Sequence, residues 1–121
     1  MQSSPVLLQH IILYSTDIRG ISSFYQKALG LGDATRQDQR HIGFQLSGLY
    51  LGFEYSDVAS IRGSLGFTPW FTVEDLFTVF ARCKQLGAKV RMEPERKERG
   101  AILAALVDPQ GHVFGIHQQG T

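Results

Sequence analysis

The sequence predicts an α+β domain built from two copies of one strand–helix–strand–strand unit. The first observation is an internal repeat: HIILYSTDIRGISSFYQKALGLG, beginning at His10, is similar to TPWFTVEDLFTVFARCKQLGAKV, beginning at Thr68. The second is that each copy combines apolar, β-branched runs with one amphipathic helical pattern. Self-similarity of this kind indicates two copies of one supersecondary unit. Because a unit of about 60 residues buries too little surface to be secure alone, we expect the copies to share one core.

The repeat continues to the ends of the two units, but its polar residues are not the same. GLYLGFE in the first unit aligns with GHVFGIH in the second, which places Glu54 over His117. At the other end His10 aligns with Thr68, so the second unit lacks the one histidine that is suited to anchor a metal.

Length and boundaries predict a single domain over residues 1–121. We place the first module at about residues 5–57, a linker at about 57–66 and the second module at about 67–119.

Composition excludes several classes of function. The formal net charge is +1, which provides no electrostatic footprint for nucleic acid. No segment is long and apolar enough to cross a membrane. The single cysteine, Cys83, has no partner for an intramolecular disulfide, and no export segment is evident, so we expect a cytoplasmic protein.

In the first unit, residues 6–14 are apolar and β-branched and predict a buried strand. Asp17 then caps a helix that Gly30 and Gly32 end. One face of this helix is apolar at the spacing i, i+3, i+4, i+7, through Ile21, Phe24, Tyr25 and Ala28. Strands at 40–46 and 49–55 form a hairpin around Ser47 and Gly48, and a short extra strand is expected near 33–36.

The second unit repeats this order, with a strand at 67–73 and a helix that begins at Asp75. The apolar face of this helix contains Leu76, Val79, Phe80, Cys83 and Leu86. Cys83 is therefore interpreted as a core residue rather than a nucleophile. A strand at 89–92 leads into PERKERG, which we interpret as a solvated loop, with a lip over a pocket as the alternative. Strands at 101–107 and 112–118 follow, joined by the turn 108–111.

Three stretches carry a family resemblance: the opening from His10 to Asp17 followed by SSFYQKALGLG, the element WFTVEDL with its downstream LGAKV, and the closing VDPQGHVFGIHQ. Together they resemble the vicinal oxygen chelate superfamily, which includes glyoxalase I, bleomycin-resistance proteins, fosfomycin-resistance enzymes and extradiol dioxygenases. The resemblance implies two tandem βαβββ modules whose mixed sheets form an open cup with the helices on the outside. It also implies that a second chain completes or enlarges the cleft, so we expect a homodimer.

In members that do chemistry, the resemblance implies a divalent metal held by donors from the first and last strands of each module. The matching positions here are His10, a residue near Gly52 to Glu54, Thr68 and Gly115. Thr68 stands where a histidine is typical, and Gly115 stands where a glutamate is typical. Catalytic zinc or iron generally needs three protein donors, so we expect no metal cofactor.

A rearranged metal site is the alternative. Residues two apart in a strand share a face, so His10, Glu54 and His117 can make a two-histidine, one-carboxylate set for Fe, Mn, Ni or Zn. The objection is that a shift of two residues moves a donor by about 6.5 Å along its strand. The structural interpretation is that His10 is an interior, hydrogen-bonded histidine and that Glu54 and His117 lie at a rim. His41 and His112 flank turns, so we expect them to be exposed and not to bind metal.

The sequence favours a pocket for an organic ligand. Trp70, Tyr14 and Tyr50 offer flat apolar area with polar edges, and Gly52 and Gly115 are expected to leave room between them. Taken singly, each of these aromatic residues is better explained as an ordinary core residue, and only as a group on one predicted concave face do they indicate a pocket. The expected ligand-binding residues are His10, Ile12, Tyr14, Tyr50, Gly52, Glu54, Thr68, Trp70, Gly115 and His117.

The context of Trp70, PWFTVEDL, is similar to the tryptophan-bearing strand of bleomycin-resistance-like proteins, which bind their drug without metal chemistry. We therefore predict a metal-free protein that binds an aromatic or amphipathic small molecule. The alternatives are a metal-dependent lyase, isomerase or dioxygenase that uses His10, Glu54 and His117, and a domain that binds a protein partner.

Overall fold

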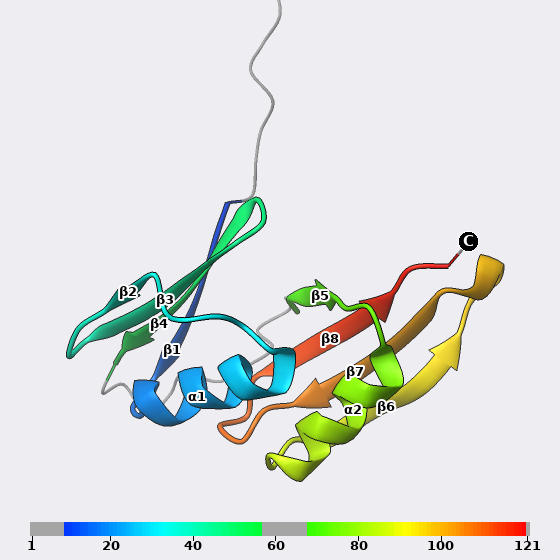
Figure 1. Ribbon diagram of the computed structural model, residues 1–121. Coiled ribbons are helices and arrows are strands. Elements are labelled where there is room, and N and C mark those ends of the chain that lie inside the picture. The colour runs from blue at the N-terminus through cyan, green and yellow to red at the C-terminus, as the bar shows by residue number, and fades with distance from the viewer. Residues whose placement is uncertain (1–8, 57–67, 121) are drawn as a thin grey trace, which may run out of the picture.

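The computed structural model describes residues 9–56 and 68–120 and contains two similar modules (Figure 1). The elements of the first module are β1 (His10–Ser15), α1 (Ile18–Leu29), β2 (Arg36–Gln37), β3 (His41–Leu46) and β4 (Leu49–Tyr55). Those of the second are β5 (Trp70–Thr72), α2 (Leu76–Gln85), β6 (Lys89–Arg96), the 3₁₀ turn η1 (Glu98–Gly100), β7 (Ile102–Val107) and β8 (Val113–Gln118). The predicted α+β fold of two βαβββ modules is confirmed.

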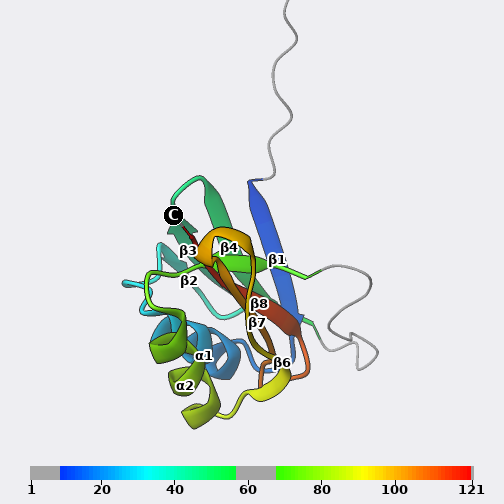
Figure 2. The ribbon, with the colours of Figure 1, turned by 90° about the vertical axis from the view of Figure 1, so that its right-hand side faces the viewer.

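Each module forms one mixed four-stranded sheet. The strand orders are β1-β4-β3-β2 and β5-β8-β7-β6, with β1 parallel to β4, β5 parallel to β8, and the remaining neighbours antiparallel. The two sheets diverge from each other above the helices in Figure 1, and α1 and α2 lie together on one side of the molecule in Figure 2. Each sheet therefore has an inner face toward the helices and an outer face away from them.

Local signals set both ends of α1 and the start of α2 as predicted. The Asp17 side chain accepts a hydrogen bond from the backbone N–H of Gly20 at 3.0 Å, and Gly30 ends α1 in the left-handed region with φ of 70°. Asp75 caps α2 in the same way through the backbone N–H of Thr78 at 3.3 Å. Cys83 is fully buried on the inner side of α2, and burial raises the pKa of its thiol to about 11, which fits a core residue.

Tyr25 joins the two modules into one core. It lies on α1 and is fully buried, and its ring centre is 5.5 Å from that of Phe53 in the first sheet and 5.1 Å from that of Phe114 in the second. Its hydroxyl donates to Asp108 at 2.8 Å, in the turn before β8. Burial, reinforced by the charge of Asp108, raises the pKa of Tyr25, so the phenol stays protonated and remains a donor.

His112 is buried, so the prediction that it is exposed was wrong. The turn before β8 folds back on itself, and Asp108 accepts hydrogen bonds from the His112 backbone N–H at 3.1 Å and from its Nδ1 at 2.9 Å. The other ring nitrogen, Nε2, lies 3.0 Å from the carbonyl oxygen of Tyr14 at the end of β1. Both ring nitrogens face acceptors, an arrangement that the doubly protonated imidazolium satisfies.

The second module differs from the prediction in two strands. The strand β5 covers only Trp70–Thr72 of the expected 67–73, of which residue 67 lies outside the described residues. The strand β6 continues through Pro94 to Arg96, so half of the expected PERKERG loop is strand. As an edge strand with register shifts between Val90 and Glu95, β6 tolerates a proline and solvated charges.

The sequence also predicted a short extra strand, an earlier start of the first strand and a linker between the modules. The expected short extra strand near 33–36 is found at its C-terminal end, as Arg36–Gln37. Residues 6–8 of the first predicted strand and the whole of the expected linker at 57–66 lie outside the described residues. None of the helices in the described part is long and apolar enough to cross a membrane.

The pair formed by His112 and Asp108 predicts a pH dependence of stability. Burial acts to lower the pKa of His112, but the hydrogen bond and charge of Asp108, together with the Tyr14 carbonyl, outweigh it and raise the pKa. Stabilisation by the protonated ring is therefore complete below the ordinary value of 6.5 and is lost as the pH rises through the raised value. We expect His112→Gln to cost about 1–3 kcal/mol of unfolding free energy at pH 5.5 and less at pH 8.5, measured by urea denaturation.

His10→Gln is the matched control, because His10 is exposed. It should keep the pH dependence of the wild type. A difference between wild type and His112→Gln that is the same at both pH values would contradict the assignment.

Candidate functional site

The outer face of the first sheet gathers the polar residues that the sequence singled out. The register of β1 with β4 pairs His10 with Tyr50, Ile12 with Gly52 and Tyr14 with Glu54. Paired residues in neighbouring strands share a face, so these six residues lie on the side away from α1. His10 is exposed rather than interior, and its ring centre is 5.5 Å from that of Tyr50.

His41 connects two of these residues and was missed by the sequence reasoning. Its Nδ1 lies 2.5 Å from Oε1 of Glu54, and its Nε2 lies 2.6 Å from Oη of Tyr50. The prediction that His41 is exposed was wrong, since it is only 6% exposed. The register of the β3–β4 hairpin places it directly opposite Glu54. That pairing follows from the two-residue turn at Ser47 and Gly48, so the signal was present in the sequence.

The sequence predicted that Gly52 would leave room on this face. Neither Gly52 nor Gly43 does so. They are paired directly across β3 and β4. A Cβ at Gly43 would overlap the Tyr50 hydroxyl, and a Cβ at Gly52 would lie 2.7 Å from Ile12 Cδ1 and 3.0 Å from His41 Cε1. The space that the two glycines provide is therefore filled by the side chains of their own sheet.

The outer face of the second sheet carries Trp70, which lies over Gly115 in the neighbouring strand. A Cβ at Gly115 would overlap the indole ring, so here too the glycine accommodates an aromatic side chain rather than leaving empty space. Trp70 is 48% exposed. Beside it, Thr72 Oγ1 lies 3.4 Å from Nδ1 of His117, and Thr68 is half-buried just before β5.

The structure of one chain does not bring the alternative metal donors together. His10 and Glu54 belong to the first sheet, where Glu54 is held by His41, and His117 belongs to the second sheet beside Thr72. Over residues 9–56 and 68–120, no three His, Cys, Asp or Glu side chains are close enough to hold a metal ion. Within the described part of a single chain, the residues therefore do not fit the metal site that was considered as the alternative.

One hollow borders His117 beside η1, and two others are lined mainly by inner-face residues. The larger of these two, of about 450 Å³, opens between the modules and is bordered by Trp70. Its walls are mostly apolar side chains of both modules, from Ile11, Leu29, Leu31, Leu46, Leu49, Pro69, Phe71 and Val73, with Ser47 and Thr72 at polar points. Its volume and lining are typical of a site for a small organic molecule. The sequence reasoning missed it because its walls come from inner-face residues of two separate modules.

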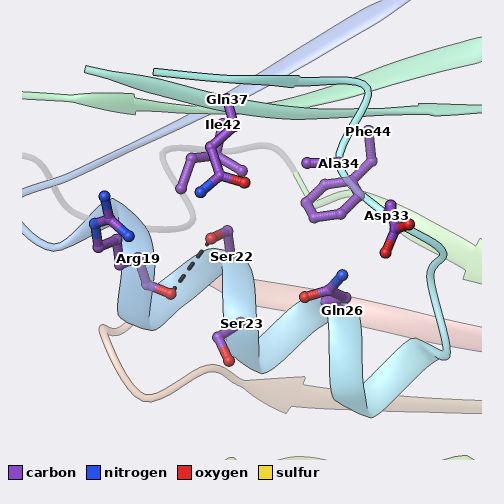
Figure 3. Close-up of a pocket in the computed structure, with 9 residues that line it drawn as sticks. All are labelled: Arg19, Ser22, Ser23, Gln26, Asp33, Ala34, Gln37, Ile42 and Phe44. Carbon is purple, nitrogen blue, oxygen red and sulfur yellow. Dashed lines mark hydrogen bonds between the residues drawn. The ribbon is translucent and has the colours of Figure 1, made fainter. Parts of the chain in front are cut away.

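The other hollow, of about 340 Å³, lies between α1 and the strands β2 and β3, on the opposite side of the first sheet from His41 (Figure 3). Polar side chains dominate it, including Arg19, Ser22, Gln26 and Asp33. Ser22 uses its hydroxyl within the helix, donating to the Arg19 carbonyl at 3.3 Å. This hollow contains none of the residues expected to bind a ligand.

Comparison with known proteins agrees with this arrangement. A family model described as the glyoxalase/bleomycin resistance protein/dioxygenase superfamily matches residues 7–116. No curated protein sequence matches the chain significantly.

Solved structures show the same fold at low sequence identity. A glyoxalase/bleomycin resistance protein/dioxygenase family enzyme from Burkholderia phytofirmans PsJN is 20% identical, with a TM-score of 0.79 over 93% of this chain and 98% of that one. TioX from Micromonospora sp. ML1 is 18% identical, with a TM-score of 0.68 over 92% and 97%. Lactoylglutathione lyase from Agrobacterium tumefaciens is 18% identical, with a TM-score of 0.67 over 95% of each chain.

The packing of Trp70 on Gly115 predicts a specific effect of adding one methyl group. Gly115→Ala should displace the indole ring and cost about 1–3 kcal/mol of stability, since the added carbon has no space. Trp70 is the only tryptophan, so its fluorescence emission reports the displacement directly. Gly32→Ala is the control, because a Cβ there meets nothing within 4 Å. Unchanged emission and acrylamide quenching in Gly115→Ala would show that the ring does not lie on the glycine.

Proposed function

This chain belongs to the glyoxalase/bleomycin resistance protein/dioxygenase superfamily, and from its geometry we propose that it binds an aromatic or amphipathic small molecule without a metal ion. The observation that carries the proposal is Trp70. Its ring lies flat against the sheet over Gly115, is about half exposed, and borders the apolar hollow between the modules. A fixed aromatic plane beside an apolar hollow suits stacking against a planar ligand.

The two outer faces supply different chemistry to such a ligand. On the second sheet, Trp70 and Gly115 continue across the strands to Ala105 and Met92, so this row is apolar. The first sheet presents a hydrogen-bonded polar group around His41. A molecule with an aromatic part and a polar part matches this division. The metal-dependent alternative with His10, Glu54 and His117 has no comparable support within one chain, because these donors are apart.

A homodimer is part of this proposal. The outer faces belong to different sheets that diverge from each other, and each keeps a large aromatic residue, Tyr14 or Trp70, close to half exposed. A second copy that covers these faces would bury both aromatic residues and enclose the ligand between two sheets.

Binding at Trp70 is tested with 8-anilinonaphthalene-1-sulfonate, a planar amphipathic probe. We expect saturable binding, seen as an increase in the fluorescence of the probe, and a loss of affinity of about tenfold or more in Trp70→Ala, because stacking and apolar contact are removed. Phe77→Ala is the matched control, since Phe77 is an equally exposed aromatic residue on α2 that borders neither hollow. Equal losses in both variants would mean that the probe binds exposed apolar surface in general.

The homodimer predicts a particle of twice the 13.5 kDa of one chain in sedimentation equilibrium. Replacing Tyr14 by Glu should shift this particle toward the monomer, because a charge would be buried between the copies. Sedimentation as a single 13.5 kDa species, at a concentration where the probe still binds, would show that one chain forms the site alone.

A further inference from the structure

The group formed by Glu54, His41 and Tyr50 is a connected chain of hydrogen bonds to which the binding proposal gives no specific chemical role. The central imidazole is buried and lies 2.5 Å from the carboxylate on one side and 2.6 Å from the phenol on the other. The carboxylate side chain is 38% exposed, and Tyr50 is half-buried. This chain of hydrogen bonds therefore has the buried imidazole of His41, a base, at its centre. The side chains at its two ends, Glu54 and Tyr50, are partly exposed.

The sheet is built to hold this chain. His41 is opposite Glu54 in the β3–β4 ladder, and the ring of Tyr50 reaches along its strand toward His41 across the paired glycines. Any side chain at Gly43 would overlap the phenol hydroxyl. The imidazole and phenol rings are nearly parallel, at 8°, with centres 5.8 Å apart. The positions of both rings are thus determined by backbone register and by the missing Cβ atoms rather than by flexible side-chain choice.

This arrangement assigns a proton-transfer role to each member. The Glu54 carboxylate can only accept, so it holds the proton of His41 on Nδ1 and leaves Nε2 to face the phenol as a base. When a ligand O–H gives its proton to Tyr50 Oη, the phenol passes its own proton to Nε2. The ligand then becomes an oxyanion, Tyr50 remains a neutral phenol, and His41 becomes an imidazolium paired with the carboxylate. A base oriented by a third group is the usual way in which proteins activate such a transfer.

A purely structural role fits the position less well. The inner face of this sheet is apolar and packs on the core, with Leu51 and Phe53 fully buried. The three hydrogen-bonded side chains lie on the outer face instead. The other titratable and charged groups near this face are His10 and Tyr14 from β1 and Arg36 from β2, which is paired with Asp38 at 3.3 Å. His10 is near enough to contact the same ligand, since its ring centre is 5.5 Å from that of Tyr50.

We propose that Tyr50, backed by His41 and Glu54, is a proton-accepting site for an acidic hydroxyl group, a phenol or an enol, on the bound ligand. Tyr50 is the ligand-facing group, and His41 and Glu54 are positioning residues that supply and stabilise the base. The inference rests on the proposed binding function and specifies the polar part of the ligand.

The test compares two probes with the same planar ring: 4-nitrophenol, which has an ionisable hydroxyl, and 4-nitroanisole, in which that hydroxyl is methylated. Both should quench Trp70. The phenol should bind at least tenfold more tightly, and at a pH where it is mostly protonated in buffer its bound form should show the absorption band of the phenolate. Tyr50→Phe and His41→Gln should abolish this band and reduce the preference to less than twofold.

Tyr55→Phe is the matched control, because Tyr55 is a tyrosine of the same strand that packs against the core on the inner face, so this variant should keep both the band and the preference. If Tyr50→Phe does not fold, as judged by circular dichroism, His41→Gln provides the same readout. Equal binding of the two probes without a phenolate band overturns the proton-accepting site while leaving ligand binding intact. Failure of both probes to quench Trp70 instead overturns the proposed binding function and the inference with it.

Discussion

The buried carboxylate of Asp108 is the interaction on which the arrangement of the two modules depends. It is only 3% exposed and accepts hydrogen bonds from Tyr25 on α1, from the His112 ring, and from the backbone N–H groups of Gln110 and His112. Burying an ionised carboxylate is costly unless such donors surround it. His112 extends the network to the Tyr14 carbonyl at the end of β1. One turn of the second module thus holds both the first strand and the first helix.

The core around this carboxylate explains why neither module is complete without the other. Tyr25 fills the space between the sheets and contacts aromatic residues of both, while Arg82 of α2 donates to the Ala28 carbonyl at the end of α1 at 2.9 Å. Removal of the second module would expose the ring of Tyr25, and removal of the first would take the Tyr25 donor away from Asp108. The sharing of one core that was expected from the size of the repeat unit is therefore built from specific polar contacts as well as from apolar area.

On the outer faces, the two modules have the same strand arrangement but carry side chains of different chemistry. The middle row of the first sheet is Ile12, Gly52 and Gly43, and the equivalent row of the second is Trp70, Gly115 and Ala105. Small residues at the centre of both sheets allow larger side chains to lie flat over them. In the first sheet those side chains are the linked His41 and Tyr50 together with Ile12, and in the second the side chain is an indole. Two copies of one unit thus present a polar face and an apolar face.

Much of the fold was readable from the sequence because its signals are local. The caps at Asp17 and Asp75, the turn at Gly48 and the apolar faces of both helices depend on residues a few positions apart, and the structure has them as expected. The alternation of strand side chains likewise placed Tyr50, Gly52 and Glu54 on one face. The roles of His41 and His112 were misjudged, because each is decided by a partner that the folded backbone brings beside it. The sequence by itself determined the two modules, their elements and the candidate faces. Only the tertiary structure decided which side chains fill the space above the glycines and which buried groups are hydrogen-bonded to each other, since both depend on contacts between strands and modules that no local pattern encodes.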